Sequence, residues 1–195
     1  MLRYRGVEVC PVCGFRYVPE LKEERRIHRA RHRQTLNTCD PKPHPALASH
    51  YAQTGAFLAI HGKSPRWLRN RLQNMATLFR RELGFDFRPY DADEPEEGDR
   101  HWLIISPDGR STGGLSARMW GTPLAWWWAW VWVIPSERGG GHAGRCWAML
   151  RARFPAIEPS APFSPPMAKF FAGRDDVTEH TRQHAGRQLQ PTEAD

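Results

Sequence analysis

The feature that most constrains the fold is a tryptophan-rich run followed at once by a glycine-rich turn. Six of the nine tryptophans lie between Trp120 and Trp132, within an apolar run over 124–134 that is bracketed by Pro123 and Pro135. This run is too short to cross a membrane, which takes a helix of about 20 residues. Apolar side chains on both faces are typical of a central strand that is covered on both sides.

Strand alternation predicts which side chains of this run share a face. One face carries Trp126, Trp128, Trp130 and Trp132, and the other carries Trp127, Ala129, Val131 and Val133. Most of these rings are therefore expected to fill the core beneath and above the strand.

The turn after this strand has the composition of an anion-binding loop. Arg138 is followed by Gly139, Gly140 and Gly141, and a helix is predicted over about 143–154. Glycines let a ligand approach the backbone closely, and the free N–H groups at a helix N-terminus bind pyrophosphate. A triple glycine alone is equally compatible with a flexible loop. A P-loop kinase is excluded because no Lys-Ser or Lys-Thr pair follows the glycines.

The N-terminal residues contain a set of metal ligands. Cys10 and Cys13 are followed by His28 and His32, in the pattern C-x2-C-x14-H-x3-H. Two thiolates from a tight turn and two imidazoles one helical turn apart close a tetrahedral zinc site. We predict a C2H2-type zinc finger over residues 1–35 with Zn²⁺ as its structural ion, because so short a unit has little apolar core. A redox-active or chance Cys-x-x-Cys is the alternative.

The rest of the chain divides by composition. Residues 36–50 are rich in proline and predict a linker, 51–173 predict an α/β (α+β) domain, and 174–195 have almost nothing apolar and predict a disordered tail. Within 51–173 we expect strands over 56–61, 85–90, 101–106 and 113–119, helices over 67–83 and about 143–154, and little regular structure over 155–166.

Charge is distributed unevenly in this chain of net charge +7. Residues 1–90 hold 17 Lys and Arg against 7 Asp and Glu. This basic half permits a nucleic-acid partner, including through the helix that carries His28 and His32. The N-terminus has no apolar core of signal-peptide length, and four cysteines are too few for a disulfide scaffold. We therefore expect a cytoplasmic protein (nuclear in a eukaryote) with no membrane partner.

The strand, turn and helix together resemble the acetyl-CoA motif of the GNAT acetyltransferases, R-x-x-G-x-A or G. Arg138, Gly141 and Ala143 fill its fixed positions. A C2H2-type finger with Cys13-Gly14-Phe15, placed before such a domain, is similar to the cohesin acetyltransferases, which acetylate a lysine on a cohesin subunit. The similarity covers roughly residues 8–172 and includes the segments 55–65, 82–85, 102–106, 132–133, 163–164 and 171–172.

This resemblance implies a GNAT-like mixed, mostly antiparallel sheet flanked by helices. It also implies an acetyl-CoA-dependent N-acetyltransferase whose acceptor is a protein lysine or another amine. The backbone of the central strand would polarise the thioester carbonyl. The residues implied to bind acetyl-CoA are Val131, Trp132, Val133, Arg138, Gly139, Gly140, Gly141, His142, Ala143, Gly144, Phe163 and Ser164.

Departures from the family pattern bear on catalysis. Ala129 stands where the family has a serine, Ser160 stands where it has its catalytic acidic residue, and 165–167 read Pro-Pro-Met in place of Asp-Pro-Thr. Glu158 is the candidate general base, with Ser160 assisting, although a solvated glutamate in a proline-rich loop is equally compatible. The alternative function is a non-catalytic zinc-finger adaptor or a DNA-binding protein with a degenerate GNAT fold. The acceptor and the oligomeric state stay open.

Overall fold

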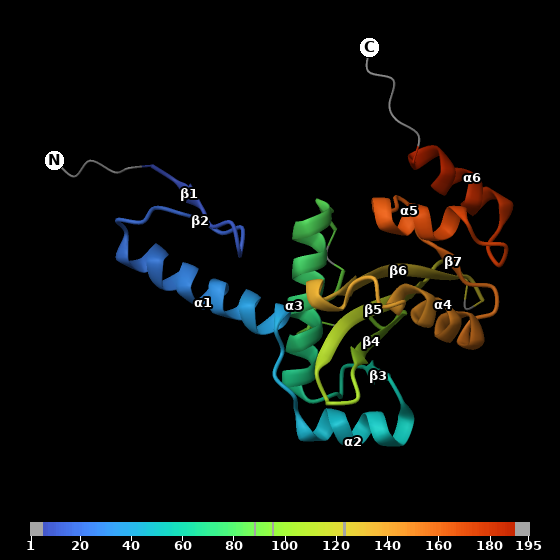
Figure 1. The fold of residues 1–195 in the computed structure, drawn as a ribbon, viewed down its shortest axis with the longest axis horizontal. Coiled ribbons are helices and arrows are strands. Elements are labelled where there is room, and N and C mark those ends of the chain that lie inside the picture. Colours follow the sequence, from blue (N-terminus) through green and yellow to red (C-terminus); the bar gives the residue numbers. More distant parts are fainter. Residues whose placement is uncertain (1–5, 88, 95, 123, 190–195) are drawn as a thin grey trace, which may run out of the picture.

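The computed structural model describes residues 6–87, 89–94, 96–122 and 124–189 of the chain. A small N-terminal unit extends from a larger domain that is built on a five-stranded sheet (Figure 1). The elements are β1 (Glu8–Val9), β2 (Arg16–Tyr17), α1 (Lys22–Cys39), α2 (Pro45–Thr54), β3 (Phe57–Ile60), α3 (Arg66–Leu83), β4 (Asp99–Ile105), β5 (Ser111–Met119), β6 (Trp126–Val133), a 3-10 turn η1 (Pro135–Glu137), α4 (His142–Arg153), β7 (Glu158–Pro159), α5 (Pro165–Ala172) and α6 (Glu179–Gln188).

The sheet confirms the predicted mixed, mostly antiparallel architecture flanked by helices. Its strands lie in the order β3-β4-β5-β6-β7. The first three pairs are antiparallel, and only β6 and β7 run parallel. Because the connection from β6 to β7 passes through α4, that helix is placed beside the sheet and its N-terminus follows directly on the end of β6 and η1.

Two apolar clusters fill the two faces of the sheet. Strand alternation divides β4 between them, since Leu103 packs with α3 and its neighbour Ile104 packs with α4 and α5. Leu72 of α3 and Trp147 of α4 are both completely buried at the centres of these clusters. The helix predicted over 67–83 is confirmed as α3, and its apolar stripe is the face that covers the sheet.

The prediction that four tryptophans share one face of β6 is wrong. The pairing of β6 with β5 shifts by one residue at Ala129, which is left without a partner strand residue. As a result Trp128 packs against Trp147, with ring centroids 5.8 Å apart, while Trp130 packs against Phe79 on the other face at 5.6 Å. This β-bulge breaks the period of two, which the residue types alone do not reveal.

The strand predicted over 85–90 is also wrong as far as the described residues go. Phe85 and Phe87 pack on Phe79 of α3, with ring centroids 5.2 and 6.2 Å away. Their alternation therefore reflects two rings that cover the end of a helix and not a place in the sheet.

The proline-rich and polar segments are more regular than their composition predicts. Within the expected linker, α1 continues to Cys39 and α2 starts at Pro45. Within 155–166, β7 joins the sheet and α5 begins with two prolines, which a helix accepts in its first turn. The tail predicted to be disordered contains α6, which is capped by the Thr178 side chain and packs on α5; residues 190–195 lie outside the described residues.

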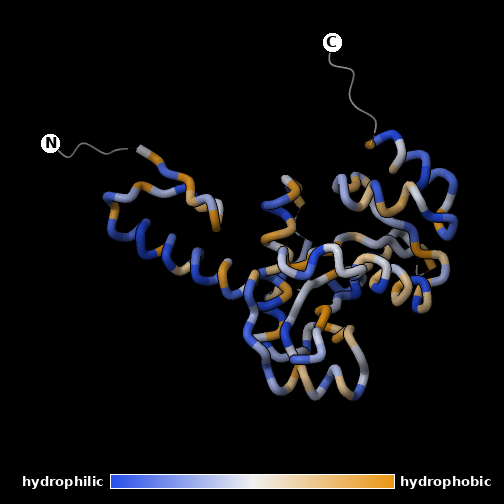
Figure 2. Tube along the Cα trace, in the orientation of Figure 1, coloured by the Kyte–Doolittle hydropathy of each residue, from blue (hydrophilic) through white to orange (hydrophobic). Residues whose placement is uncertain are grey.

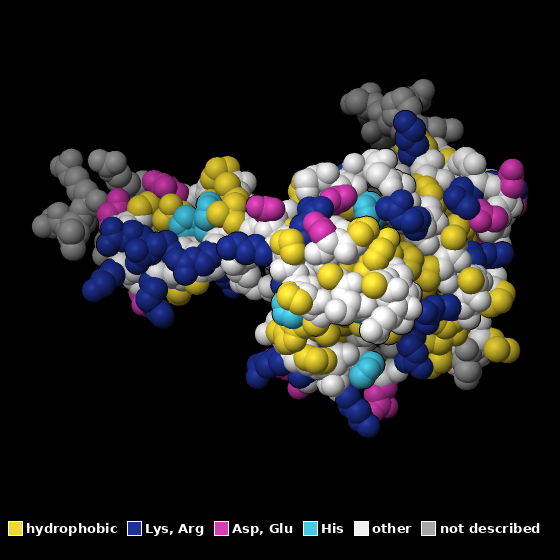
Figure 3. Space-filling view, turned by 60° about the horizontal axis from the view of Figure 1, so that its bottom comes forward, with side chains coloured by type: hydrophobic (Ala, Val, Ile, Leu, Met, Phe, Trp, Pro, Cys, Tyr) yellow, Lys and Arg dark blue, Asp and Glu magenta, His cyan; other side chains and the backbone are white. Residues whose placement is uncertain are grey.

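The small N-terminal unit consists of the β1–β2 hairpin and α1. Figure 2 shows α1 as hydrophilic over most of its length, and Figure 3 shows a row of Lys and Arg side chains along it. Its contact with the domain runs through α3, where the Arg81 guanidinium donates hydrogen bonds to the backbone carbonyls of Cys13 and Val12. None of the described helices is long and apolar enough to cross a membrane.

Candidate functional site

The four predicted metal ligands meet between the loop of the β1–β2 hairpin and the middle of α1. One ligand atom from each of Cys10, Cys13, His28 and His32 lies within 4.8 Å of the other three. The Cys10 Sγ is 3.3 Å from the His32 Nδ1. The His28 Nε2 is buried and has no hydrogen-bond partner in the described part of the chain. A buried imidazole nitrogen without a partner, beside two thiols, fits a zinc ion.

The electrostatics of the two cysteines also fit a cation. Hydrogen bonding, chiefly from the Cys13 backbone N–H, lowers the pKa of Cys10 to about 5, so its thiolate form is favoured. Burial raises the pKa of Cys13. Two adjacent thiolates repel each other, and a divalent cation between them would ionise both.

In the larger domain, a groove of about 530 Å³ runs along the end of β6 and the glycine-rich turn. It is bounded by the C-terminus of α3, the N-terminus of α4 and the first turn of α5. Its lining includes most residues that the sequence marks for acetyl-CoA: Val131, Trp132, Val133, Arg138, Gly139, Gly141, His142, Ala143, Gly144 and Ser164. Gly140 and Phe163 do not line it, and Phe163 lies instead in a smaller adjoining pocket of about 70 Å³.

The groove is open because β6 and β7 separate. These strands pair at only two positions, the last of which joins Trp128 to Pro159. Farther along β6, Ile134 N–H donates to Thr112 of β5 at 2.9 Å. In an antiparallel ladder every second residue faces the partner strand, so the backbone N–H of Val131 points away from β5, into the gap that β7 leaves.

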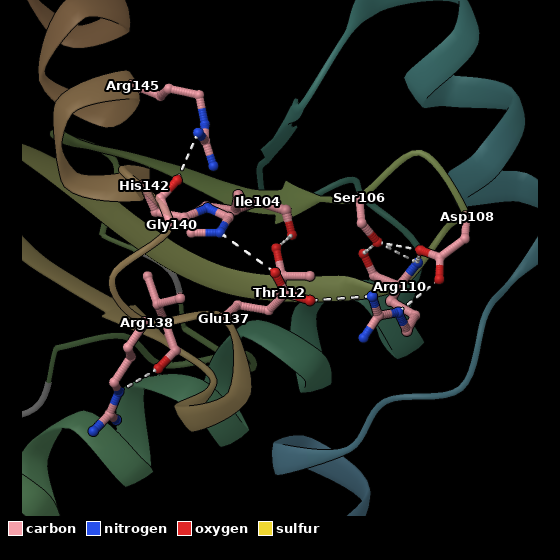
Figure 4. A network of polar contacts seen from close by, with 11 residues as sticks. Ile104, Ser106, Asp108, Arg110, Thr112, Glu137, Arg138, Gly140, His142 and Arg145 are labelled. Carbon is pink, nitrogen blue, oxygen red and sulfur yellow. Dashed lines mark hydrogen bonds and ion pairs between the residues drawn. The ribbon is translucent and has the colours of Figure 1, made fainter.

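The turn at 138–141 presents the start of α4 to the same groove (Figure 4). Gly139 and Gly141 have φ values of 79° and 75°, in the left-handed region where a side chain is strained. The first N–H groups of a helix have no intrahelical acceptor, and no side chain of the described residues caps those of α4. Arg145 donates to the Gly140 carbonyl at 2.8 Å and so fixes the turn from within. The start of α4 can therefore offer backbone donors to an anion.

Arg138 is held by Glu82, which is not among the site residues predicted from the sequence. Its guanidinium binds both carboxylate oxygens of Glu82, at 2.6 and 2.7 Å, and its Nε donates to the Val133 carbonyl at 3.0 Å. The Trp132 indole N–H donates to the same carboxylate at 2.9 Å. These bonds lower the pKa of Glu82, chiefly through Arg138. The signal available in the sequence was the segment 82–85, which begins with Glu82 and belongs to the family resemblance.

Glu137 is the second carboxylate on the groove, and it is paired as well. It lies 3.1 Å from the Arg110 guanidinium and 3.8 Å from the ring of His142. Burial lowers the pKa of His142, so its ring is neutral at pH 7. The ring turns toward Glu137 in Figure 4.

The structure separates the candidate base from the groove. The Glu158 carboxylate accepts hydrogen bonds from the hydroxyls of Thr178 at 3.1 Å and Thr181 at 2.7 Å. It lines a pocket of about 180 Å³ against α6, and not the groove. Ser160 lines the small adjoining pocket, where its hydroxyl reaches only the Ala161 carbonyl at 3.5 Å. The family resemblance implies a catalytic role at Ser160 and the nearby Glu158, whereas in the structure the Glu158 carboxylate is bound by Thr178 and Thr181 at the start of α6.

No protein-family profile matches the chain, and no curated protein matches it. The solved structures that are similar to this chain include three acetyltransferases. The xEco2 acetyltransferase domain has a TM-score of 0.44 and 17% identity, over 58% of this chain and 81% of that one. Tetrahymena GCN5 has a TM-score of 0.46 and 14% identity, over 64% of this chain and 84% of that one. The aminoglycoside acetyltransferase meta-AAC0020, from an uncultured soil metagenomic sample, has a TM-score of 0.43 and 10% identity, over 71% of this chain and 89% of that one. Because these identities and TM-scores are low, no activity follows from the similar structures, and the function proposed below is based on the groove.

Proposed function

We propose that this chain is an N-acetyltransferase that uses acetyl-CoA, with the groove along β6 and α4 as its binding site. The observation that carries the proposal is the start of α4, with its backbone donors, next to an open strand edge. The free N–H groups of Ala143 and Gly144 face a space large enough for a pyrophosphate, and the gap beside Val131 continues from it. This combination suits a ligand with a charged end and an extended, uncharged arm.

The acetyl group supplies the electrophilic thioester carbonyl, and the chain's own part is to hold and polarise it. The Val131 N–H, which points into the gap, is placed to donate to a developing oxyanion. The acceptor is a protein lysine or another amine. A lysine has a free pKa of about 10.4 and must lose a proton before it attacks.

A charge placed in the first turn of α4 tests the cofactor site. Gly144 has open space where a Cβ would be built. Gly144→Glu adds a carboxylate that stabilises a helix N-terminus but repels a pyrophosphate, and Gly144→Gln has the same size without the charge. By calorimetry we expect Gly144→Glu to weaken acetyl-CoA binding about tenfold or more, which corresponds to about 1.4 kcal/mol, and Gly144→Gln to weaken it less. Wild-type protein that binds no acetyl-CoA at millimolar concentration would overturn the proposal.

The second candidate function is a non-catalytic adaptor that keeps the fold and the groove. One observation favours it: both groove carboxylates, Glu82 and Glu137, are tied to arginines, and Glu158 faces α6. Incubation with acetyl-CoA and mass spectrometry of the protein's own four lysines separate the two functions. Acetylation above that of heat-denatured protein excludes the adaptor. Binding of acetyl-CoA without any transfer, to itself or to lysate proteins, favours it.

We further propose that Cys10, Cys13, His28 and His32 hold one structural Zn²⁺. The support is the meeting of four ligand atoms within 4.8 Å in a unit that buries almost no apolar side chain. Zinc analysis of protein purified without added metal is expected to give one equivalent. Less than a tenth of an equivalent, even after refolding with Zn²⁺, would contradict this.

A further inference from the structure

A polar cleft lies between the N-terminal unit and the larger domain. It has a volume of about 420 Å³ and is formed where the C-terminal half of α1 crosses α3. Hydrogen-bond donors dominate its lining, and neither an aromatic ring nor a carboxylate lines it in the described part of the chain. The residues are Ala30, Arg33, Gln34, Asn37, Thr38, Arg71, Asn74, Met75 and Ser111.

Arg71 gives the cleft a positive charge that no carboxylate of the described residues balances. Its guanidinium is half-buried, donates to the Ser111 hydroxyl at 2.8 Å and lies over the Trp67 ring at 5.3 Å. Burial lowers the pKa of Arg71, and no carboxylate of the described residues pairs with it to offset that cost. A partly desolvated cation without a counterion is stabilised when an anion enters.

A row of exposed arginines on α1 leads to the cleft. Arg25, Arg29 and Arg33 follow one another at intervals of four residues, about 6 Å along the helix axis, and so share a face. All three are exposed, and none forms an ion pair with another described residue. Arg26, by contrast, is bound to Glu23 at 2.6 Å. Figure 3 shows the row of Lys and Arg side chains running along α1 to the larger domain.

We propose that this row and the cleft bind the phosphodiester backbone of a nucleic acid, with Arg33 and Arg71 each binding one phosphate at the cleft. Guanidinium forks match phosphate oxygens, and the exposed Asn37 amide adds a neutral donor. Because no aromatic ring lines the cleft to stack on bases, binding is expected to be independent of sequence and dominated by charge. This site is separate from the acetyl-CoA groove, so the inference does not depend on the enzymatic proposal.

Fluorescence anisotropy with the full zinc-loaded chain tests the site. The probes are a labelled DNA duplex of about 20 base pairs, a DNA single strand of that length and an RNA of that length, which together identify the type of strand. Neutralisation of four phosphates by Arg25, Arg29, Arg33 and Arg71 gives a slope of about −3.6 in log affinity against log salt for the duplex. Arg71→Gln and Arg33→Gln are each expected to make the slope about 0.9 less steep.

Arg26→Gln is the matched control, since it removes the same charge from the same helix but from an arginine that is already paired. It is expected to leave the slope unchanged. Arg33 is exposed, so its variant stays folded, which zinc content and thermal melting verify. Binding that does not depend on salt, or an equal loss in the control, would overturn the proposal. Equal competition by polyglutamate at the same charge would also overturn it, in favour of an acidic protein partner.

Discussion

The N-terminal unit and the sheet domain are stabilised in different ways. Over residues 6–40 the only buried side chains are Cys10, Cys13, Thr35 and Thr38, whereas the sheet domain buries two apolar clusters, one on each face. Burial of apolar surface supplies most of the stability of an ordinary domain. A unit without it needs another source of stability, and the zinc ion proposed above would supply one. Loss of that metal is then expected to unfold the N-terminal unit, whereas the sheet domain is expected to unfold when its core is disrupted.

The largest expected effect comes from removing one metal ligand. Cys13→Ser leaves three ligands, which do not close a tetrahedral site, and apparent binding of structural zinc contributes about 10–16 kcal/mol. We expect zinc to be lost and residues 8–35 to unfold first, while acetyl-CoA affinity changes little because the groove belongs to the other core. Zinc content, thermal melting and calorimetry with acetyl-CoA on one preparation measure this.

Cys39→Ser is the control for that experiment. Cys39 ends α1 and is not among the four clustered ligands, so zinc binding should survive its replacement. If Cys13→Ser retains one equivalent of zinc with unchanged melting, the ligand set has been misassigned.

The reverse experiment disrupts the core of the sheet domain. Leu72 is fully buried in the cluster between α3 and the sheet. Leu72→Ala is expected to destabilise the domain by about 2–5 kcal/mol, through lost burial and the cavity left behind. Urea unfolding followed by tryptophan fluorescence measures the change, and bound zinc should stay at the wild-type level. A fall in zinc content equal to that of Cys13→Ser would show that the two parts unfold as one.

The sheet domain should also lose stability in mild acid. His101 of β4 is buried against the Tyr90 ring, and this burial lowers the pKa of His101 to about 4. The negative charge of Asp99 raises that pKa and the positive charge of Arg118 lowers it, but burial has the largest effect. The unfolded histidine titrates near 6.5, so the unfolded state binds more protons as pH falls from about 6.5 to about 4. That difference is worth roughly 3 kcal/mol over the full range.

His101→Phe isolates this contribution. Neither ring nitrogen of His101 has a hydrogen-bond partner among the described residues, so phenylalanine removes the titration without breaking a bond. The free energy of unfolding is measured from pH 7.5 to 4.5 in both proteins. Protonation of the zinc ligands is common to both, and the variant should lose less stability over that interval. Parallel curves would mean that His101 does not titrate in this range.

What the sequence predicts well here is local, and what it misses depends on contacts between distant segments. Three short-range patterns illustrate the first kind. The spaced ligands Cys10, Cys13, His28 and His32 come together, the apolar stripe of α3 covers the sheet, and the turn at 138–141 leads into α4. The bulge at Ala129 and the pairing of Arg138 with Glu82 require two segments to meet, and no local period reports such a meeting. Glu158 is the candidate base because it lies two residues before Ser160, which stands at the family's catalytic position, but its carboxylate is bound by Thr178 and Thr181 at the start of α6, a helix within the predicted disordered tail.

The smallest expected effect concerns the link between the two parts. Arg81 of α3 donates to the carbonyls of Cys13 and Val12 from an exposed position, so each hydrogen bond contributes about 0.5–1.5 kcal/mol at most. Arg81→Gln should leave zinc content and the melting of the sheet domain unchanged, while hydrogen exchange of the β1–β2 hairpin becomes faster. Arg80→Gln is the control, because among the described residues the Arg80 side chain donates within the domain, to the Phe85 carbonyl at 3.2 Å. Equal exchange rates in the two variants would show that the hydrogen bonds of Arg81 do not stabilise the hairpin.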